Sequence, residues 1–103
     1  MNKIETFLKT SYPPGSYHAI LQKFLQKQYR KGLAEPSIKH LYRSLIALGE
    51  TLGSVPIKKI TYQTLKKYVD DLKLNYAPGT IRPIVGDIKQ FFKWCKKKII
   101  VLF

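Results

Sequence analysis

Basic side chains near the end of the chain are spaced to bind phosphate groups together. The stripe consists of Arg82, Lys89, Lys93 and Lys96. At about 100° per residue on an α-helix, these side chains fall within about 60° of one another, well away from the apolar face. Lysines and arginines arranged in this way neutralise the phosphates of a nucleic-acid backbone. The spacing therefore predicts a cationic stripe suited to a polyanion.

Gly86 lies in the same stripe, between Arg82 and Lys89. A glycine in an exposed helix interior costs about 1 kcal/mol relative to alanine, so its presence needs a reason. A closely approaching phosphate backbone is one reason, because glycine has no side chain to hold another backbone away. Tight packing by a neighbouring helix is the other. The sequence leaves both interpretations open.

The remaining basic residues are distributed unevenly among the predicted helices. Residues 35–52 carry Lys39, His40 and Arg43 opposite an apolar stripe, and residues 16–31 carry Lys23, Lys27 and Arg30. The helix expected over residues 61–75 mixes its lysines with Asp70 and Asp71, so its outer face is nearly neutral and indicates ordinary solvation. A charge concentrated on some helices and absent from others favours nucleic-acid binding.

The whole chain is strongly basic. Its 103 residues include 19 Lys and Arg against 6 Asp and Glu, a net charge of +13. Repulsion among so many positive charges opposes folding to a compact state. Proteins with this charge usually bind nucleic acid or an anionic membrane surface. A merely solvated lysine-rich surface is the alternative. Hydrophobic residues make up 45% of the chain, enough for the core of one globular domain, which excludes disorder by composition.

Several classes of protein are excluded by simple counts. The single cysteine, Cys95, excludes a disulfide scaffold. The longest unbroken apolar run, Ile99–Phe103, is too short to cross a membrane. Residues Met1–Lys9 lack the apolar core of a signal peptide. A free cysteine without an export signal predicts a cytoplasmic protein that does not bind membranes.

No catalytic, metal or cofactor site is predicted. His18 and His40 are too few and too far apart in the sequence to indicate a metal site. Cys95 falls on an apolar stripe, where an inert core thiol is expected. The segment Gly49–Gly53 lacks the Lys-Ser/Thr pair that follows a phosphate-binding loop.

Glycines and prolines divide the chain into four segments with helical periodicity. The helices are expected over residues 16–31, 35–52, 61–75 and 80–98. Ser16, Thr61 and Thr80 are the expected N-caps, and Gly32 is the expected stop of the first helix. Leu65, Tyr68, Val69 and Leu72 are expected to form the buried stripe of the third helix.

The expected fold is all-α, a compact four-helix bundle-like domain over residues 16–98. Residues 1–15 are expected to be a partly flexible N-terminal segment. Within it, Ile4, Phe7 and Leu8 either form one short extra helical turn on the bundle or fray. Residues 99–103 are expected to be the last helical turn or the start of a linker.

An ordered set of short motifs resembles the N-terminal core-binding, SAM-like domain of the tyrosine recombinases, the phage-integrase family. The motifs are Gly32-Leu33, Ser37-Ile38, Ile60-Thr61 followed by Leu65, Tyr68 and Leu72, Pro78-Gly79-Thr80-Ile81-Arg82, and Ile88, Phe91, Phe92 and Trp94. The resemblance runs from about Tyr17 to Ile100. The order of the motifs, above all Thr80-Ile81-Arg82 before Phe91-Phe92, makes it fairly specific.

The resemblance implies a non-catalytic module that clamps one face of duplex DNA for integration or recombination. Its second and fourth helices would lie toward the major groove, and these are two of the helices identified above as basic. The implied DNA contacts are Ser37, Lys39 and Arg43, then Thr80, Arg82, Lys89, Lys93, Lys96 and Lys97. Besides DNA, the implied partners are a C-terminal catalytic domain beyond Phe103 and other recombinase protomers.

The chain departs from the family pattern in places. Ala34 stands where Ser or Thr is common, and Thr64 stands where an acidic residue is common. His40 and Arg43 match the family's catalytic His-x-x-Arg pattern, but they lie in the expected binding domain, so we interpret the match as chance. We expect a fragment that ends at a domain boundary.

Two other functions remain open on the sequence alone. One is a free-standing nucleic-acid binder, such as a helix-turn-helix regulator or an RNA-binding helical module. The other is a basic protein-interaction module whose lysines are only solvated. The target DNA sequence, the source element and the choice between integration, excision and resolution are not encoded in any recognisable motif.

Overall fold

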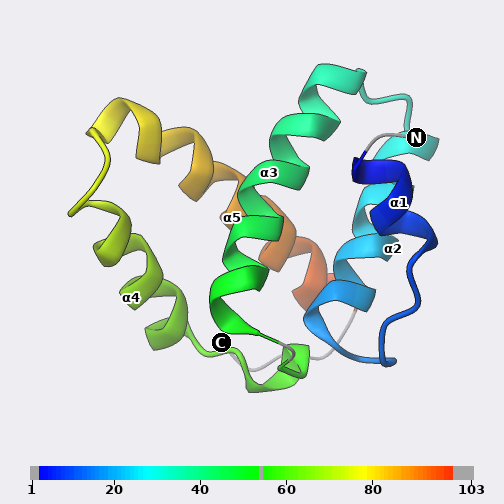
Figure 1. Ribbon diagram of the computed structural model, residues 1–103, viewed down its shortest axis with the longest axis horizontal. Coiled ribbons are helices and arrows are strands. Elements are labelled where there is room, and N and C mark those ends of the chain that lie inside the picture. The colour runs from blue at the N-terminus through cyan, green and yellow to red at the C-terminus, as the bar shows by residue number, and fades with distance from the viewer. Residues whose placement is uncertain (1–2, 54, 99–103) are drawn as a thin grey trace.

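The structure of the chain is a computed structural model that describes residues 3–53 and 55–98 (Figure 1). Its elements are α1 (Lys3–Lys9), α2 (Tyr17–Arg30), α3 (Glu35–Leu52), a short 3-10 helix η1 (Ile57–Lys59), α4 (Tyr62–Leu72) and α5 (Pro78–Lys98). The described residues contain no strand, only an isolated bridge between Ser16 and Pro56. The predicted all-α class is confirmed: α2 to α5 are the four expected helices, and α1 is the extra turn.

The core lies where α2, α3 and α5 meet. In Figure 1, α3 passes in front of α5, with α1 and α2 on one side of this crossing and α4 on the other. Phe91 of α5 is fully buried, and its ring lies 5.5 Å from that of Tyr17 and 5.2 Å from that of Phe24. The Tyr17 hydroxyl donates a hydrogen bond of 2.6 Å to the Leu45 carbonyl of α3. These contacts hold the three helices to one another.

Local capping explains where α2 and α4 begin. The Ser16 hydroxyl accepts a hydrogen bond from the Ala19 amide, and Thr61 accepts one from the Thr64 amide. Both predicted N-caps are confirmed. Gly32 has a φ of +80°, a left-handed conformation that glycine adopts without a steric cost, and it directly follows the C-cap of α2 as predicted.

The structure corrects the expected bounds of two helices. α5 begins at Pro78, because the Ala77 carbonyl accepts the first helical hydrogen bonds and a proline fixes the backbone angle needed at a helix start. Thr80 therefore lies inside the helix and is not its N-cap. Pro83 also lies inside α5. α4 ends at Leu72, whose carbonyl accepts hydrogen bonds from the turn that follows.

The four apolar residues predicted to form the buried stripe of α4 are less buried than expected. Leu65, Tyr68, Val69 and Leu72 are half-buried, and α4 contributes no fully buried residue. The reason is position: α4 packs at the edge of the bundle, where a helix covers the core on one side only (Figure 1). Helical periodicity predicts which side of a helix faces inward, but not how much covers it.

The N-terminal segment forms the short helix α1 and does not fray over Lys3–Lys9. Ile4 and Phe7 are buried. The Gln22 side chain of α2 donates hydrogen bonds of 2.7 Å to the Phe7 carbonyl and 2.6 Å to the Thr10 carbonyl, which tie the end of α1 to α2. Residues 99–103, predicted to be linker or the last helical turn, lie outside the described residues. The predicted domain bounds stay predictions.

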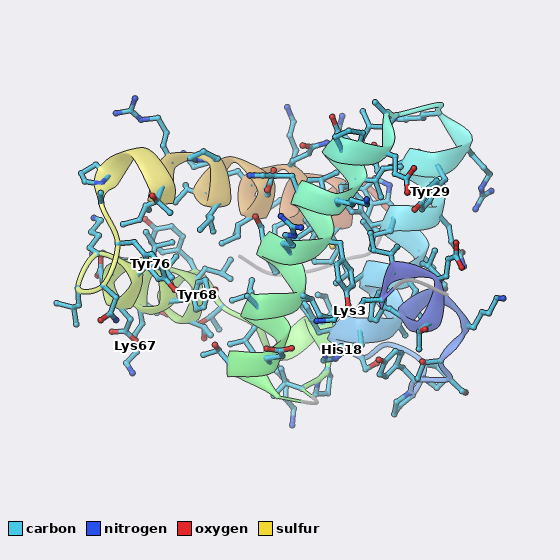
Figure 2. All side chains as sticks on the ribbon, turned by 45° about the horizontal axis from the view of Figure 1, so that its top comes forward. Lys3, His18, Tyr29, Lys67, Tyr68 and Tyr76 are labelled. Carbon is cyan, nitrogen blue, oxygen red and sulfur yellow. The ribbon has the colours of Figure 1, made fainter. Side chains whose placement is uncertain are left out.

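Burial lowers the pKa of His18, and the charge of Glu50 offsets this only in part. The His18 ring, labelled in Figure 2, stacks on Tyr12 at 4.9 Å. Because the folded-state pKa lies below the unfolded value of 6.5, the unfolded chain binds a proton more readily. The neutral His18 ring therefore contributes its full stabilisation when the pH is above the unfolded value of 6.5. This stabilisation is lost as the pH falls through the folded-state pKa.

We predict that the wild-type chain loses more stability than His18→Gln between about pH 7.5 and about pH 5. Replacing His18 removes the group that must take up a proton on unfolding, so the variant's pH dependence is shallower. Urea unfolding followed by circular dichroism at the two pH values measures the difference. Parallel curves for the two proteins would contradict the assignment.

Candidate nucleic-acid interface

The outer side of α5 is a basic surface. We define the α5 basic face as Arg82, Lys89, Lys93, Lys96 and Lys97, and all of these residues are exposed. Gly86 lies among them, and a Cβ built on it would meet nothing within 4 Å. The interpretation that a neighbouring helix packs tightly on Gly86 is therefore excluded among the described residues. The glycine leaves a bare stretch of backbone within the basic face.

A small polar junction joins α3 to α5. Asp87 Oδ2 of α5 accepts a hydrogen bond of 2.7 Å from the Ser44 hydroxyl and lies 2.6 Å from His40 Nδ1. His40 lies on the exposed side of α3 with Lys39 and Arg43, as predicted, and its half-exposed ring also pairs with Asp87 of α5. The sequence analysis did not identify Ser44 and Asp87. Neither polar residue interrupts the regular spacing of apolar residues on its helix, so the hydrophobic pattern does not mark it.

The junction shows how the basic face is oriented relative to α3. Asp87 follows Arg82 by five residues, which places it about 140° away around the helix. Lys89 is about 160° from Asp87 by the same count. The α5 basic face therefore looks away from the contact with α3. Thr80 falls within about 20° of Asp87, so it lies on the side that faces α3.

The predicted DNA contacts consequently fall into two groups. On α3, Ser37 is on the side of the junction, whereas Lys39 and Arg43 lie on the outer flank of the helix, about 140° and about 100° from Ser44. All three are exposed. Ser37 and Thr80 are both exposed near the starts of α3 and α5, which diverge from the crossing of the two helices (Figure 1).

Instead, α4 and α2 border the α5 basic face. Near the start of α5, Arg82, Gly86 and Lys89 line a hollow of about 710 Å³ with Lys73 and Tyr76. Toward its end, a smaller hollow of about 380 Å³ is lined by both α5 and α2. No acidic residue lines either hollow. Asp87, the acidic residue of α5, is occupied at the junction.

The free thiol of Cys95 is buried in the core. Burial raises the pKa of the Cys95 thiol to about 12, so the reactive thiolate is not formed near neutral pH. Over residues 3–53 and 55–98, no three His, Cys, Asp or Glu side chains are grouped so that they could hold a metal ion. None of the helices in this part of the chain is long and apolar enough to span a membrane.

Gly49 and Gly86 form a matched pair for a stability test. A Cβ on Gly49 would lie 2.7 Å from Cε1 of the buried Tyr17, whereas one on Gly86 would meet nothing. We predict that Gly49→Ala destabilises the domain by about 1–3 kcal/mol through overpacking. Gly86→Ala stabilises it by about 0.5–1 kcal/mol, because alanine favours the helix. Urea unfolding measures both changes, and a destabilising Gly86→Ala would contradict the open position of that residue.

Comparison with known proteins points to one family. Over 73 residues the chain is 32% identical to a tyrosine recombinase of Agathobacter rectalis, a match that covers 71% of this chain. The chain spans only 24% of the length of that relative. No family model matches the chain, and no solved structure matches it. The similarity thus suggests the tyrosine recombinase family at a distance.

Proposed function

We propose that this chain is the DNA-binding, core-binding module of a site-specific tyrosine recombinase and clamps duplex DNA at a recombination site. The observation that carries the proposal is the α5 basic face, whose cations line one solvent-exposed side of the helix, with Asp70 of α4 as an acidic neighbour beside Lys89, Lys93 and Lys96. The similarity to a named tyrosine recombinase supports the choice of DNA as the polyanion.

Phosphate neutralisation is the main task of the α5 basic face in this proposal. Each phosphate contact by Lys or Arg releases condensed counterions, so the affinity falls steeply as salt rises. Arg82 has the planar guanidinium that binds either a phosphate or a guanine edge with two hydrogen bonds. The bare backbone at Gly86 lets a DNA strand approach α5 closely.

The α3 side adds a second group of contacts. In this proposal Ser37 and Thr80, near the starts of α3 and α5, offer hydroxyl donors to phosphate or base edges, and Lys39 and Arg43 add contacts along the outer flank of α3. In this proposal the module itself is non-catalytic. DNA cleavage and rejoining belong to a separate catalytic domain, and other protomers complete the assembly on DNA.

The proposal is tested by fluorescence anisotropy with labelled duplex DNA and with structured RNA. We expect duplex binding on the order of micromolar or weaker at about 50 mM salt, because the opposing half of the clamp is missing. The logarithm of the affinity should fall linearly with the logarithm of the salt concentration. Stronger binding to RNA would favour an RNA-binding module. Absence of binding to either nucleic acid at low salt would contradict the proposal and favour a protein-interaction module.

A further inference from the structure

A second cationic surface adjoins the C-terminal end of the α5 basic face. It is a hollow of about 1220 Å³ between α2, the loop before it and η1, and we call it the α2 hollow. Its basic lining residues are Lys23, Lys27, Arg30, Lys31 and Lys58, and no acidic residue lines it. Trp94 of α5 forms part of its wall. None of these residues is among the DNA contacts that the family resemblance implies.

Like charges gather along α2 at this hollow. Lys23, Lys27 and Lys31 follow one another at intervals of four residues, and like charges at this spacing destabilise a helix by about 0.2–0.5 kcal/mol per pair. The negative end of the helix dipole offsets this cost for Lys27 and Arg30 in the last turn of α2 and for Lys31, its C-cap. It does not do so for Lys23, in the middle of α2, or for Lys58, which comes from η1.

The α2 hollow is continuous with the α5 basic face. Lys93 and Lys97 of that face line the smaller hollow together with Lys27 and Lys31 of α2. Lys27, Lys31 and Trp94 line both hollows. A band of positive charge therefore runs along α5 and continues onto α2, and Asp70 of α4 borders it beside Lys89, Lys93 and Lys96. At its α2 end the band turns from the outer side of α5 toward Trp94, which lies about 20° from Asp87 around the helix.

We propose that the α2 hollow binds the phosphodiester backbone of the duplex held by the α5 basic face and so lengthens the DNA footprint of the domain. This inference rests on the proposed function. Lysines four residues apart on α2 are separated by about 6 Å along the helix axis. Each DNA strand carries one phosphate about every 3.4 Å along the duplex axis. A strand that runs beside α2 thus presents a phosphate within reach of each lysine.

The footprint makes a prediction about duplex length. The α5 basic face from Arg82 to Lys97 spans about 22 Å, which corresponds to about seven base pairs. A duplex of about 8 base pairs fits this face, whereas one of about 20 base pairs also reaches the α2 hollow. A long duplex offers more registers at which the domain can bind, which by itself raises the apparent affinity. We expect the long duplex to bind more tightly than this statistical effect explains.

The test compares three proteins on both duplexes. The test variant is Lys23→Gln/Arg30→Gln/Lys58→Gln, and the matched control is Lys3→Gln/Lys9→Gln/Lys67→Gln, which removes the same charge from exposed sites on α1 and α4. Figure 2 shows Lys67 at the outer edge of α4. We expect the test variant to bind the short duplex like the control but the long duplex at least about tenfold more weakly, with a salt slope smaller by about 2–3.

Trp94 supplies a second readout, because it is the chain's one tryptophan and borders the α2 hollow. Its fluorescence should change with the long duplex in the wild type and in the control, and much less in the test variant. Equal binding of the long duplex by test variant and control, with equal salt slopes, would overturn the inference while leaving the proposed function intact. Failure of the wild type to bind even the short duplex would overturn the proposed function itself.

Discussion

Reversing the charge of the α5 basic face should lower duplex DNA affinity by about 100- to 1,000-fold at about 50 mM salt. The variant is Arg82→Glu/Lys89→Glu/Lys93→Glu. Under the proposed function, each substitution removes a phosphate contact and places a negative charge near the DNA backbone. All three residues are exposed and none packs in the core, so the fold should survive. Anisotropy titrations over a salt series measure the effect, and circular dichroism verifies the fold.

Two further variants show which surface carries the binding. Lys3→Glu/Lys9→Glu/Lys67→Glu produces the same change in net charge at exposed sites away from the basic face, and it should cost much less affinity. Lys39→Glu/Arg43→Glu tests the outer flank of α3 separately. If the α3 variant abolished binding while the α5 variant bound like the wild type, the assignment of the main phosphate contacts to α5 would be wrong.

The second large effect concerns stability. Phe91→Ala should lower the free energy of unfolding by about 3–5 kcal/mol, because truncating a buried aromatic ring leaves a cavity. The Phe91 ring lies within 5.5 Å of the rings of Tyr17, Phe24 and Phe92, so three parts of the core lose a partner at once. Small domains are stable by about 5–15 kcal/mol in total, so this single change is a large fraction of the whole.

Chemical denaturation followed by Trp94 fluorescence and by circular dichroism measures the loss. Leu74→Ala is the matched control, because Leu74 is also apolar but 81% exposed, and it should alter stability by less than about 0.5 kcal/mol. A Phe91→Ala variant as stable as the control would contradict the position of Phe91 at the centre of the core.

Much of the fold could be predicted from local signals. The bounds of α3 were correct because an apolar stripe at helical spacing runs through residues 35–52 and breakers stand at both ends. The start of α5 was misplaced because Thr80 resembles an N-cap, whereas Pro78 at the first helical position decided where the helix begins. The degree to which α4 is buried depends on its position at the edge of the bundle. The residues of α4 alone do not predict that position.

The candidate site shows a similar limit. Periodicity located the α5 basic face, since the angular positions of Arg82 and Lys89 follow from the helix itself. It could not show that this face looks away from α3, because the direction depends on the junction of Asp87 with His40 and Ser44. The α2 hollow was missed for a related reason: Lys58 and Trp94 are far from α2 in the sequence and meet it only in the folded chain.

The central claim is that the outer side of α5 contacts duplex DNA, and amide chemical shifts during a duplex titration test it most directly. At low ionic strength we expect the largest shifts at Arg82, Gly86, Lys89 and Lys93, with small shifts along α1 and the outer side of α4. Unmoved α5 resonances in a titration that saturates elsewhere on the domain would contradict the claim.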